Sequence, residues 1–478
     1  MNKEVIYKNF LWKFAERIMA QAVTTIVSIV LARILAPKDY GAISLIMIFI
    51  AMANVVMTSG FGNALIQKKN ADTLDFSTVF YFNLLFSIVV YIGIYFGAPG
   101  IAYFYELPIL TPVLRVMGIS VIISSINSIQ HAFVSKQLLF KRFFWSTLFG
   151  TLLSGIVGVI TAVNGAGVWA LVAQYITNLC VDTIVLGITV SWRPTREFSF
   201  DRLKQLFSYG WKLFCSGFLD TGYNQLRSLI IGKMYTTAQL AYYDQGQKYP
   251  QLIVTNVNTS ISSVLLPAIS KEQENPDMVK YMTRKSVAVS SYVMWPLMMG
   301  LVGVAEPFVR ILLTDKWLFC VPYLRIACFT YAFWPIHTAN LEAIKAMGRS
   351  DLFFKMEIIK KVFGILLLLL AMKHGVVAIA LTGIVNTLIS CVVNMYPNKS
   401  LLNYKYSEQI KDMLPPMVLA GVMAIIVQMV SWVISNDILL LLVQIMLGAF
   451  IYVVGSIILK LKSFQYILNI LMKKKQSA

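Results

Sequence analysis

Charge is scarce in this chain of 478 residues. Charged residues make up only 13% of the sequence, about half the share that is usual in soluble proteins. So little charge leaves too little polar surface to keep a globule of this size in water. Apolar residues, 58% of the total, come in runs of about twenty, the length with which a helix crosses ~30 Å of hydrocarbon. The composition therefore predicts a membrane protein with many spans.

Residues that carry bond chemistry are also few. The chain has only three histidines and 22 acidic residues, and it has no HExxH, P-loop, GxSxG or Ser/His/Asp grouping. Its five cysteines are scattered in or beside apolar segments, without CxxC or Cys/His metal-ligand spacing. We therefore expect no enzyme activity, no catalytic residues, no metal site and no cofactor.

Fourteen segments have the length and composition of membrane spans. They lie near residues 10–35, 42–66, 77–98, 109–133, 144–163, 166–190, 207–231, 247–268, 286–304, 321–344, 353–372, 375–396, 414–434 and 437–459. With the N-terminus inside, the inner segments hold 25 Lys and Arg residues and the outer loops only five. The positive-inside rule then predicts that both termini are cytoplasmic. The net charge of +19 comes mostly from loop residues. It is better explained by membrane orientation and by contact with lipid headgroups than by binding to nucleic acid.

The sequence also repeats itself at offsets between 199 and 210 residues. Trp12-Lys13 corresponds to Trp211-Lys212, and Leu114-Arg115-Val116 corresponds to Leu324-Arg325-Ile326. Six spans per repeat is an even number, so both halves insert the same way up. The predicted fold is an all-α membrane protein of about fourteen transmembrane helices. Two parallel six-helix lobes, 1–206 and 207–400, surround a central cavity, and 401–478 adds two helices and a basic tail.

Polar residues recur every three or four positions in the first and seventh spans. The first stripe is Lys13, Arg17, Gln21, Thr24, Thr25 and Ser28, and the second is Lys212, Ser216, Asp220, Tyr223, Asn224 and Arg227. At the repeat offset the stripes are equivalent helix faces. Facing lipid, each would be costly, whereas facing each other they would line a shared hydrated cavity. The alternative is a buried ion-pair network that holds each lobe together, with Glu16, Asp220 and Glu342 as counter-charges.

These stripes define the predicted site. We predict a cationic substrate-binding surface in the cavity, made of Arg17, Arg227, Lys13, Lys212 and Lys248. Gln21, Asp220 and Asn224 are predicted to line the same cavity, and Glu16 and Asp220 are the candidates for ion coupling. Arg115 and Arg325 are also equivalent positions, but snorkelling towards the outer face explains them as well.

Several segments resemble the Wzx-type polysaccharide flippases, most closely the colanic-acid and teichuronic-acid exporter branch. They are Leu31 to Gly41 (LARILAPKDYG), Gly60 to Lys68 (GFGNALIQK), Gly165 to Val172, Ser191 to Pro194 (SWRP), Leu265 to Ser270, Ala305 to Val309, Thr314 to Trp317 and Gly348 to Asp351. The likeness runs from about residue 10 to 400 and is weaker in the last two spans. It implies the multidrug/oligosaccharidyl-lipid/polysaccharide exporter superfamily, whose two lobes form a V around a cavity.

The resemblance also implies a function. Such proteins move a polyprenyl-diphosphate-linked oligosaccharide from the inner to the outer leaflet of the bacterial inner membrane by alternating access, for the synthesis of cell-surface polysaccharide or lipopolysaccharide. The implied partners are this lipid-linked glycan, membrane lipids and other polysaccharide assembly proteins. Coupling to Na⁺, to H⁺ or to the membrane potential stays open. Two alternatives also stay open: a cation-coupled multidrug extruder, whose cavity should favour acidic residues, and a non-transporting scaffold for glycan assembly.

Overall fold

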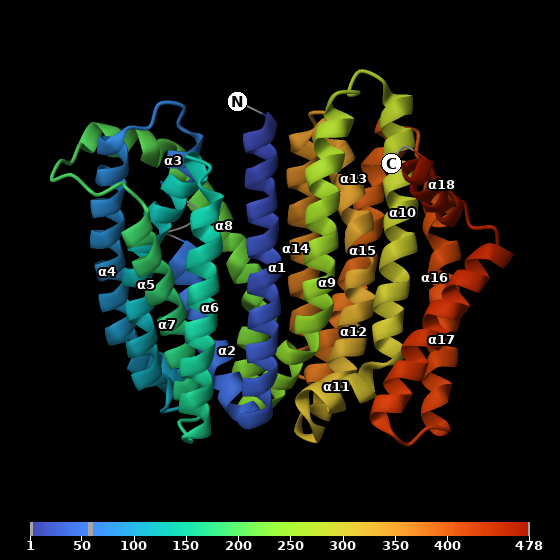
Figure 1. Cartoon of the computed structure of the whole chain (residues 1–478), viewed down its shortest axis with the longest axis horizontal. Coiled ribbons are helices and arrows are strands. Elements are labelled where there is room, and N and C mark those ends of the chain that lie inside the picture. Colours follow the sequence, from blue (N-terminus) through green and yellow to red (C-terminus); the bar gives the residue numbers. More distant parts are fainter. Residues whose placement is uncertain (1–2, 56–60, 477–478) are drawn as a thin grey trace. The chain divides into compact units, whose positions relative to one another are not determined.

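The computed structural model describes residues 3–55 and 61–476, so Gly60 of the GFGNALIQK segment lies outside it. The described residues are helical apart from short connections, and they form two compact units, Met1–Ala241 and Tyr242–Ala478. The helices of the first unit are α1 (Lys3–Ile34), α2 (Pro37–Val55), α3 (Asn63–Gln67), α4 (Thr73–Tyr105), α5 (Leu110–Lys136), α6 (Phe140–Val163), α7 (Val168–Thr189) and α8 (Phe200–Met234) (Figure 1).

Within the first unit, α6 packs along α7 and α1 packs on α6, while α5 lies between α4 and α7. Helix α8 contacts α2, α3 and α4. Contacts therefore place α8 with the first unit, whereas the sequence repeat counts residues from 207 onwards with the second lobe. The repeat-based lobes 1–206 and 207–400 remain a prediction about internal symmetry, which is a different property from contact.

The second unit contains ten α-helices and two short 3-10 segments among its described residues. They are α9 (Thr237–Ser270, whose first turn belongs to the first unit), α10 (Pro276–Gly303), α11 (Ala305–Leu313), η2 (Asp315–Cys320), α12 (Val321–Ala332), α13 (Trp334–Ala346), α14 (Ser350–Ala371), α15 (Val376–Leu401), α16 (Tyr406–Met429), η3 (Val430–Trp432), α17 (Asp437–Ile458) and α18 (Lys462–Gln476). The most extensive helix contact in this unit is between α10 and α16. Arg284 joins them by donating both Nε and Nη2 to the Asp412 carboxylate, at 2.9 Å each.

The predicted all-α fold of many spans is confirmed. Twelve helical segments in the described chain are long and apolar enough to cross a membrane, with η2, α12 and α13 counted as one. Helices α8 and α14, of 35 and 22 residues, are also long enough. They fall outside that set because α8 is rich in polar residues and α14 carries several charged residues. Adding them gives the fourteen membrane-length segments that the sequence predicts.

The sequence did not predict every helix. The span predicted at 42–66 covers α2, the helical residues from 61 onwards, and residues 56–60, which lie outside the described chain. Helices α11 and α18 were not predicted at all, since neither has an apolar run of membrane length. The chain does break at Trp334-Pro335, between α12 and α13, as a proline inside an apolar run leads one to expect.

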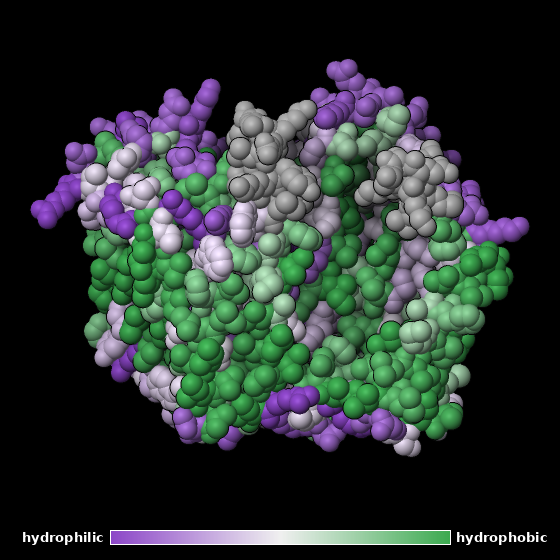
Figure 2. Space-filling view, viewed as in Figure 1, coloured by the Kyte–Doolittle hydropathy of each residue, from purple (hydrophilic) through white to green (hydrophobic). Residues whose placement is uncertain are grey.

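The surface of each unit fits a lipid environment. Large apolar side chains point outwards along the long helices, and Ile188 and Leu370 are 75% and 73% exposed. Figure 2 shows broad hydrophobic areas along the helices and hydrophilic residues gathered towards the helix ends. A water-soluble protein rarely exposes contiguous apolar areas of this size.

Gly41, from the LARILAPKDYG segment, permits a close backbone contact that gives the first stability prediction. A Cβ added there would lie 1.8 Å from the carbonyl oxygen of Thr237, which belongs to backbone and cannot turn away. We expect overpacking in Gly41→Ala to lower the free energy of unfolding by roughly 1–3 kcal/mol. The melting temperature of the purified protein should fall accordingly. Gly93→Ala is the matched control, because nothing lies within 4 Å of its added Cβ. An unchanged melting temperature in Gly41→Ala would contradict this contact.

Candidate functional site

The first polar stripe begins near the start of α1. Lys13 is exposed and its ammonium lies 2.7 Å from the Glu16 carboxylate, one turn along the helix. The same ammonium lies 5.0 Å from the centre of the Phe143 ring, on α6, within the range of a cation–π contact. Arg17 is exposed, and among the described residues it has no hydrogen bond or ion pair. Lys13 is therefore engaged, whereas Arg17 is open to a ligand.

The rest of this stripe satisfies much of its own hydrogen bonding. Thr25 donates to the Gln21 carbonyl at 2.7 Å, and Ser28 donates to the Thr25 carbonyl at 3.0 Å. The Gln21 amide donates to the Thr25 hydroxyl at 3.3 Å. Bonds of this kind let small polar residues remain inside a membrane-length helix. The face is polar without depending on a neighbouring helix.

The second stripe lies on α8. Lys212 is exposed, without a hydrogen bond or ion pair to any described residue. Asn224 donates to the Asp220 carboxylate at 3.2 Å. Arg227 is partly buried, and its Nε is fully buried with no hydrogen-bond partner in the part of the chain that the structure describes. A buried guanidinium N–H without an acceptor is costly, so an anionic ligand at Arg227 would satisfy a donor that the protein leaves unpaired.

Lys248 belongs to α9 in the second unit. It is partly buried and forms no hydrogen bond or ion pair with the described residues. The structure thus brings Lys13 to Glu16 and Asp220 to Asn224, each pair within one helix. The meeting of the α1 and α8 stripes, and of either with Lys248, in a shared cavity remains a prediction.

The paired arginines of the repeat differ from each other. Arg115 on α5 donates from Nε to the Tyr95 carbonyl at 3.2 Å, and its guanidinium lies 4.2 Å from the centre of the Tyr95 ring. Arg325 on α12 has a buried Nε without a hydrogen-bond partner among the described residues. Arg115 therefore already has protein partners, which makes it a useful control for Arg17 and Arg227.

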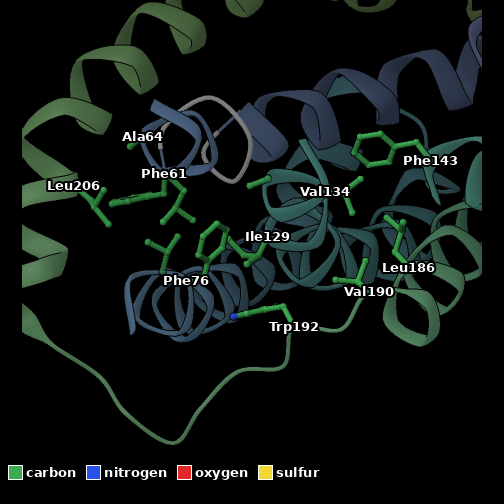
Figure 3. Close-up of a cluster of buried hydrophobic side chains, with 13 residues drawn as sticks. Phe61, Ala64, Phe76, Ile129, Val134, Phe143, Leu186, Val190, Trp192 and Leu206 are labelled. Carbon is green, nitrogen blue, oxygen red and sulfur yellow. The ribbon is translucent and has the colours of Figure 1, made fainter. Parts of the chain in front are cut away.

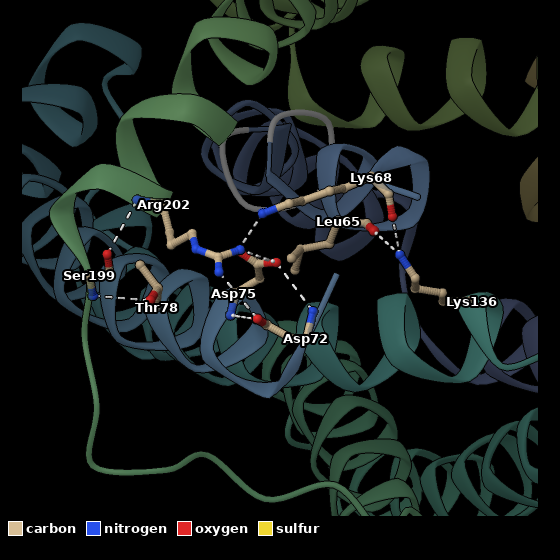
Figure 4. Close-up of polar contacts among 8 residues, drawn as sticks. All are labelled: Leu65, Lys68, Asp72, Asp75, Thr78, Lys136, Ser199 and Arg202. Atoms are coloured by element: carbon tan, nitrogen blue, oxygen red, sulfur yellow. Dashed lines mark hydrogen bonds and ion pairs between the residues drawn. The ribbon is translucent and has the colours of Figure 1, made fainter. Parts of the chain in front are cut away.

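A polar centre that the sequence did not reveal lies at one end of the first unit. The fully buried Asp75, in the first turn of α4, accepts from Lys68 at 2.6 Å and from Arg202 of α8 at 3.3 Å. Figure 4 shows its carboxylate between these two cations, with Asp72 beside it. From the sequence alone, Lys68 and Arg202 were interpreted only as two of the many loop charges that determine membrane orientation. The spacing of Asp72 and Asp75, a helix-start pattern, was the signal that could have identified this position.

A second acidic residue was also missed. Asp182 lies inside the apolar run of α7, and its carboxylate is 2.9 Å from His131 of α5. A carboxylate within a predicted span is in itself a sign of function, and it could have been noticed at residue 182.

Comparison with known proteins identifies the family. The polysaccharide biosynthesis protein family matches residues 30–322, more than half of the chain. The chain belongs to this family. Teichuronic acid biosynthesis protein TuaB of Bacillus subtilis is 21% identical over 377 residues, 78% of each chain. Lipopolysaccharide biosynthesis protein WzxC of Escherichia coli is 22% identical over 404 residues, 82% of this chain and 80% of its own. The resemblance seen in the sequence is confirmed.

Solved structures confirm the type of fold. The lipid II flippase MurJ in an inward closed conformation superposes with a TM-score of 0.75 at 17% identity, over 94% of this chain and 98% of its own. An inward-facing MATE family transporter of the MOP superfamily superposes with a TM-score of 0.61 at 13% identity, over 81% and 98%. At these identities the likeness concerns the fold alone.

In this polysaccharide biosynthesis protein, two of the family-like segments pack together. Phe61 of GFGNALIQK and Trp192 of SWRP belong to one buried apolar cluster with Phe76, Ile129 and Leu206 (Figure 3). The Trp192 ring lies 5.9 Å from that of Phe76. The cluster lies among the helices whose ends carry Asp75 and its partners. These segments therefore maintain the packing of one end of the unit.

Proposed function

We propose that this protein moves a polyprenyl-diphosphate-linked oligosaccharide from the inner to the outer leaflet of a bacterial inner membrane by alternating access. The observation that carries the proposal is the pair of arginines, Arg17 and Arg227, in membrane-length helices of a chain from a polysaccharide biosynthesis family. Arg17 has no described protein partner, and the buried Nε of Arg227 has none either. We also propose that the protein transports its substrate unchanged, without bond chemistry.

The chemistry of a diphosphate fits these side chains. A guanidinium can donate two parallel hydrogen bonds to phosphate oxygens, whereas an ammonium acts as a point charge. Lys13, Lys212 and Lys248 would add positive charge around Arg17 and Arg227, and Gln21, Asp220 and Asn224 would complete a polar cavity wall. Moving about two negative charges outwards is electrically favourable when the inside is negative, and at a potential of 100 mV it releases ~5 kcal/mol. Glu16 and Asp220 remain the proposed carboxylates if a cation is coupled as well.

A flipping assay tests the proposal. The purified protein is reconstituted in liposomes with a fluorescent short-chain polyprenyl-diphosphate sugar, and transfer between leaflets is followed by loss of signal to a membrane-impermeant quencher. We expect faster transfer than in protein-free liposomes, with no faster transfer of a labelled phosphatidylcholine. No acceleration would reject the proposal in favour of a scaffold. Transport of lipophilic cations instead of the diphosphate would identify a multidrug extruder.

The proposed orientation places both termini in the cytoplasm, because the connections on that side carry most of the loop Lys and Arg residues. Reporter fusions after Arg196 and Asn275 should report the cytoplasm, and fusions after Glu106 and Thr314 should report the outside. These four positions lie between helices, where a fusion interrupts no span. A cytoplasmic signal at Thr314 would rule out the proposed topology.

A further inference from the structure

Asp182 is an acidic residue deep in the first unit, and its carboxylate is only 14% exposed. Its Oδ2 accepts a hydrogen bond from the Asn127 amide at 2.8 Å and lies 2.9 Å from Nε2 of His131. Its Oδ1 is buried without a hydrogen-bond partner among the described residues. An ionisable group at this depth is costly unless it has a role.

The arrangement fixes which nitrogen of His131 is able to take up a proton. An ionised carboxylate only accepts hydrogen bonds, so Nε2 carries the hydrogen that faces Asp182. Nδ1 is then the basic nitrogen, and in the described chain it has no hydrogen-bond partner. The His131 side chain is 41% exposed, so it is not enclosed by the helix packing. Histidine ordinarily changes charge between about pH 5 and 8.

The helices near the pair also carry other charged and titratable groups. The Phe143 ring of α6 lies between His131 and the Lys13 ammonium. Its centre is 4.6 Å from the centre of the His131 ring and 5.0 Å from the ammonium. The other groups with described side chains on these elements are Glu16, Arg17 and Arg33 on α1; Lys38, Asp39 and Tyr40 on α2; Asp75, Tyr81, Tyr91, Tyr95, Tyr103 and Tyr105 on α4; Arg115 and Lys136 on α5; Lys141 and Arg142 on α6; and Tyr175 and Cys180 on α7. Of these, Glu16 is paired with Lys13, and Asp75 with Lys68 and Arg202.

We propose that His131 and Asp182 form a proton-binding site that is coupled through Phe143 to Lys13. One proton from water binds Nδ1 of His131, and the pair changes from a net charge of −1 to zero. The neutral pair attracts Lys13 less, and the new imidazolium shares the Phe143 ring with the ammonium. Lys13 is therefore held less firmly on Phe143 after protonation. By linkage, an anion bound at Lys13 favours proton binding at His131, and the proton favours the anion.

Proton binding can be measured without transport. The chain has three histidines, so ¹⁵N-histidine NMR of the purified protein gives a small set of imidazole signals, and His131→Gln assigns one of them. The signals are followed from about pH 5 to 8, where histidine ordinarily changes charge, and the His131 signal should change with pH. In Asp182→Asn this change should move to lower pH, because the anionic partner that favours the imidazolium is lost. The exposed His374 is the internal control, and its midpoint should not move.

Three results would overturn the site. They are a His131 signal that stays constant over this range, a midpoint that is the same in Asp182→Asn, and a Na⁺-dependent shift at constant pH, which would identify a metal-ion site. If Asp182→Asn fails to fold, Asn127→Leu is measured instead. It removes the amide donor that shares Oδ2, so it should also move the His131 midpoint, and an unmoved midpoint there overturns the site equally.

The effect of the site on transport rests on the proposed function, and it is measured separately. In the flipping assay, the wild-type rate should change several-fold between pH 5.5 and 8, whereas His131→Gln should give a rate nearly independent of pH. Phe143→Leu keeps the pair but removes the shared ring, so His131 should still titrate while the rate loses its pH dependence. An absence of flipping at every pH, with normal titration of His131, would reject the proposed function and leave the proton site standing. A wild-type pH profile that persists in Phe143→Leu would reject the coupling to Lys13.

Discussion

Replacing Asp75 by asparagine is expected to destabilise the protein more than any other single conservative change in the first unit. The Asp75 carboxylate is fully buried, with Lys68 at 2.6 Å and Arg202 at 3.3 Å from the same oxygen, Oδ1. Asparagine keeps the shape but removes the charge that both cations face. Breaking a buried ion pair from one side costs about 3–5 kcal/mol. We expect the lower end, because the two cations are 24% and 35% exposed and can turn to water.

The consequences of this change reach several helices. Arg202 is in the first turn of α8. Ser199, the residue that precedes this helix, donates its backbone N–H to the Thr78 hydroxyl of α4 at 3.2 Å. Lys68 follows α3, and its carbonyl accepts from Lys136 at the end of α5. The Asp75 carboxylate therefore connects the ends of helices that the chain reaches at distant points. The melting temperature of the purified protein should fall by several degrees, and the yield of folded protein should fall with it.

Asp72→Asn is the matched control for this prediction. Asp72 caps α4 by accepting from the Asp75 backbone N–H at 2.9 Å. This hydrogen bond is the main cause that lowers the pKa of the Asp72 carboxyl, and the charge of Arg202 adds to it. Asparagine caps a helix about as well as aspartate, and Asp72 is 50% exposed, so the cost should stay below about 1 kcal/mol. Equal melting temperatures for the two variants would show that Asp75 has no special role.

The sequence predicted the helices well because a membrane span is a local property of the chain. An apolar run of sufficient length must form a helix, since hydrocarbon offers no other partner to the backbone. The failures follow from the same rule. Helices α11 and α18 are too short or too polar to resemble spans.

The site could be predicted only in part, for a similar reason. The two stripes are periodic, so each could be read from one helix. Partners on different helices could not be read in this way, because no periodic pattern connects them. Arg202 lies 127 residues from Asp75, and His131 lies 51 residues from Asp182. Even Lys68, only 7 residues from Asp75, precedes the start of α4. The sequence also suggested that ion pairs hold the stripes together. In the structure, Lys13 does form an ion pair with Glu16. Arg17 forms none with any described residue.

Neutralising both arginines of the proposed site, Arg17 and Arg227, is expected to have the largest effect on transport. Each charge-assisted hydrogen bond to a phosphate contributes about 1.5–3 kcal/mol, and each ~1.4 kcal/mol is a factor of ten. The double variant Arg17→Gln, Arg227→Gln should therefore lose roughly a hundredfold or more of the flipping rate at low substrate concentration. Arg227→Gln alone should lose most of the export of glycan in cells. Glutamine keeps some length and hydrogen bonding, so the loss reports on charge.

The stability of the same variants separates binding from a structural role. Removing a guanidinium whose buried Nε has no described acceptor should leave the melting temperature of Arg227→Gln unchanged or slightly higher. A network that held the lobe together would give the opposite result, a lower melting temperature that Asp220→Asn restores. Arg115→Gln is the matched control, because its guanidinium already contacts Tyr95. It should cost some stability and little transport. Normal flipping by a well-folded double variant would show that Arg17 and Arg227 do not bind the diphosphate.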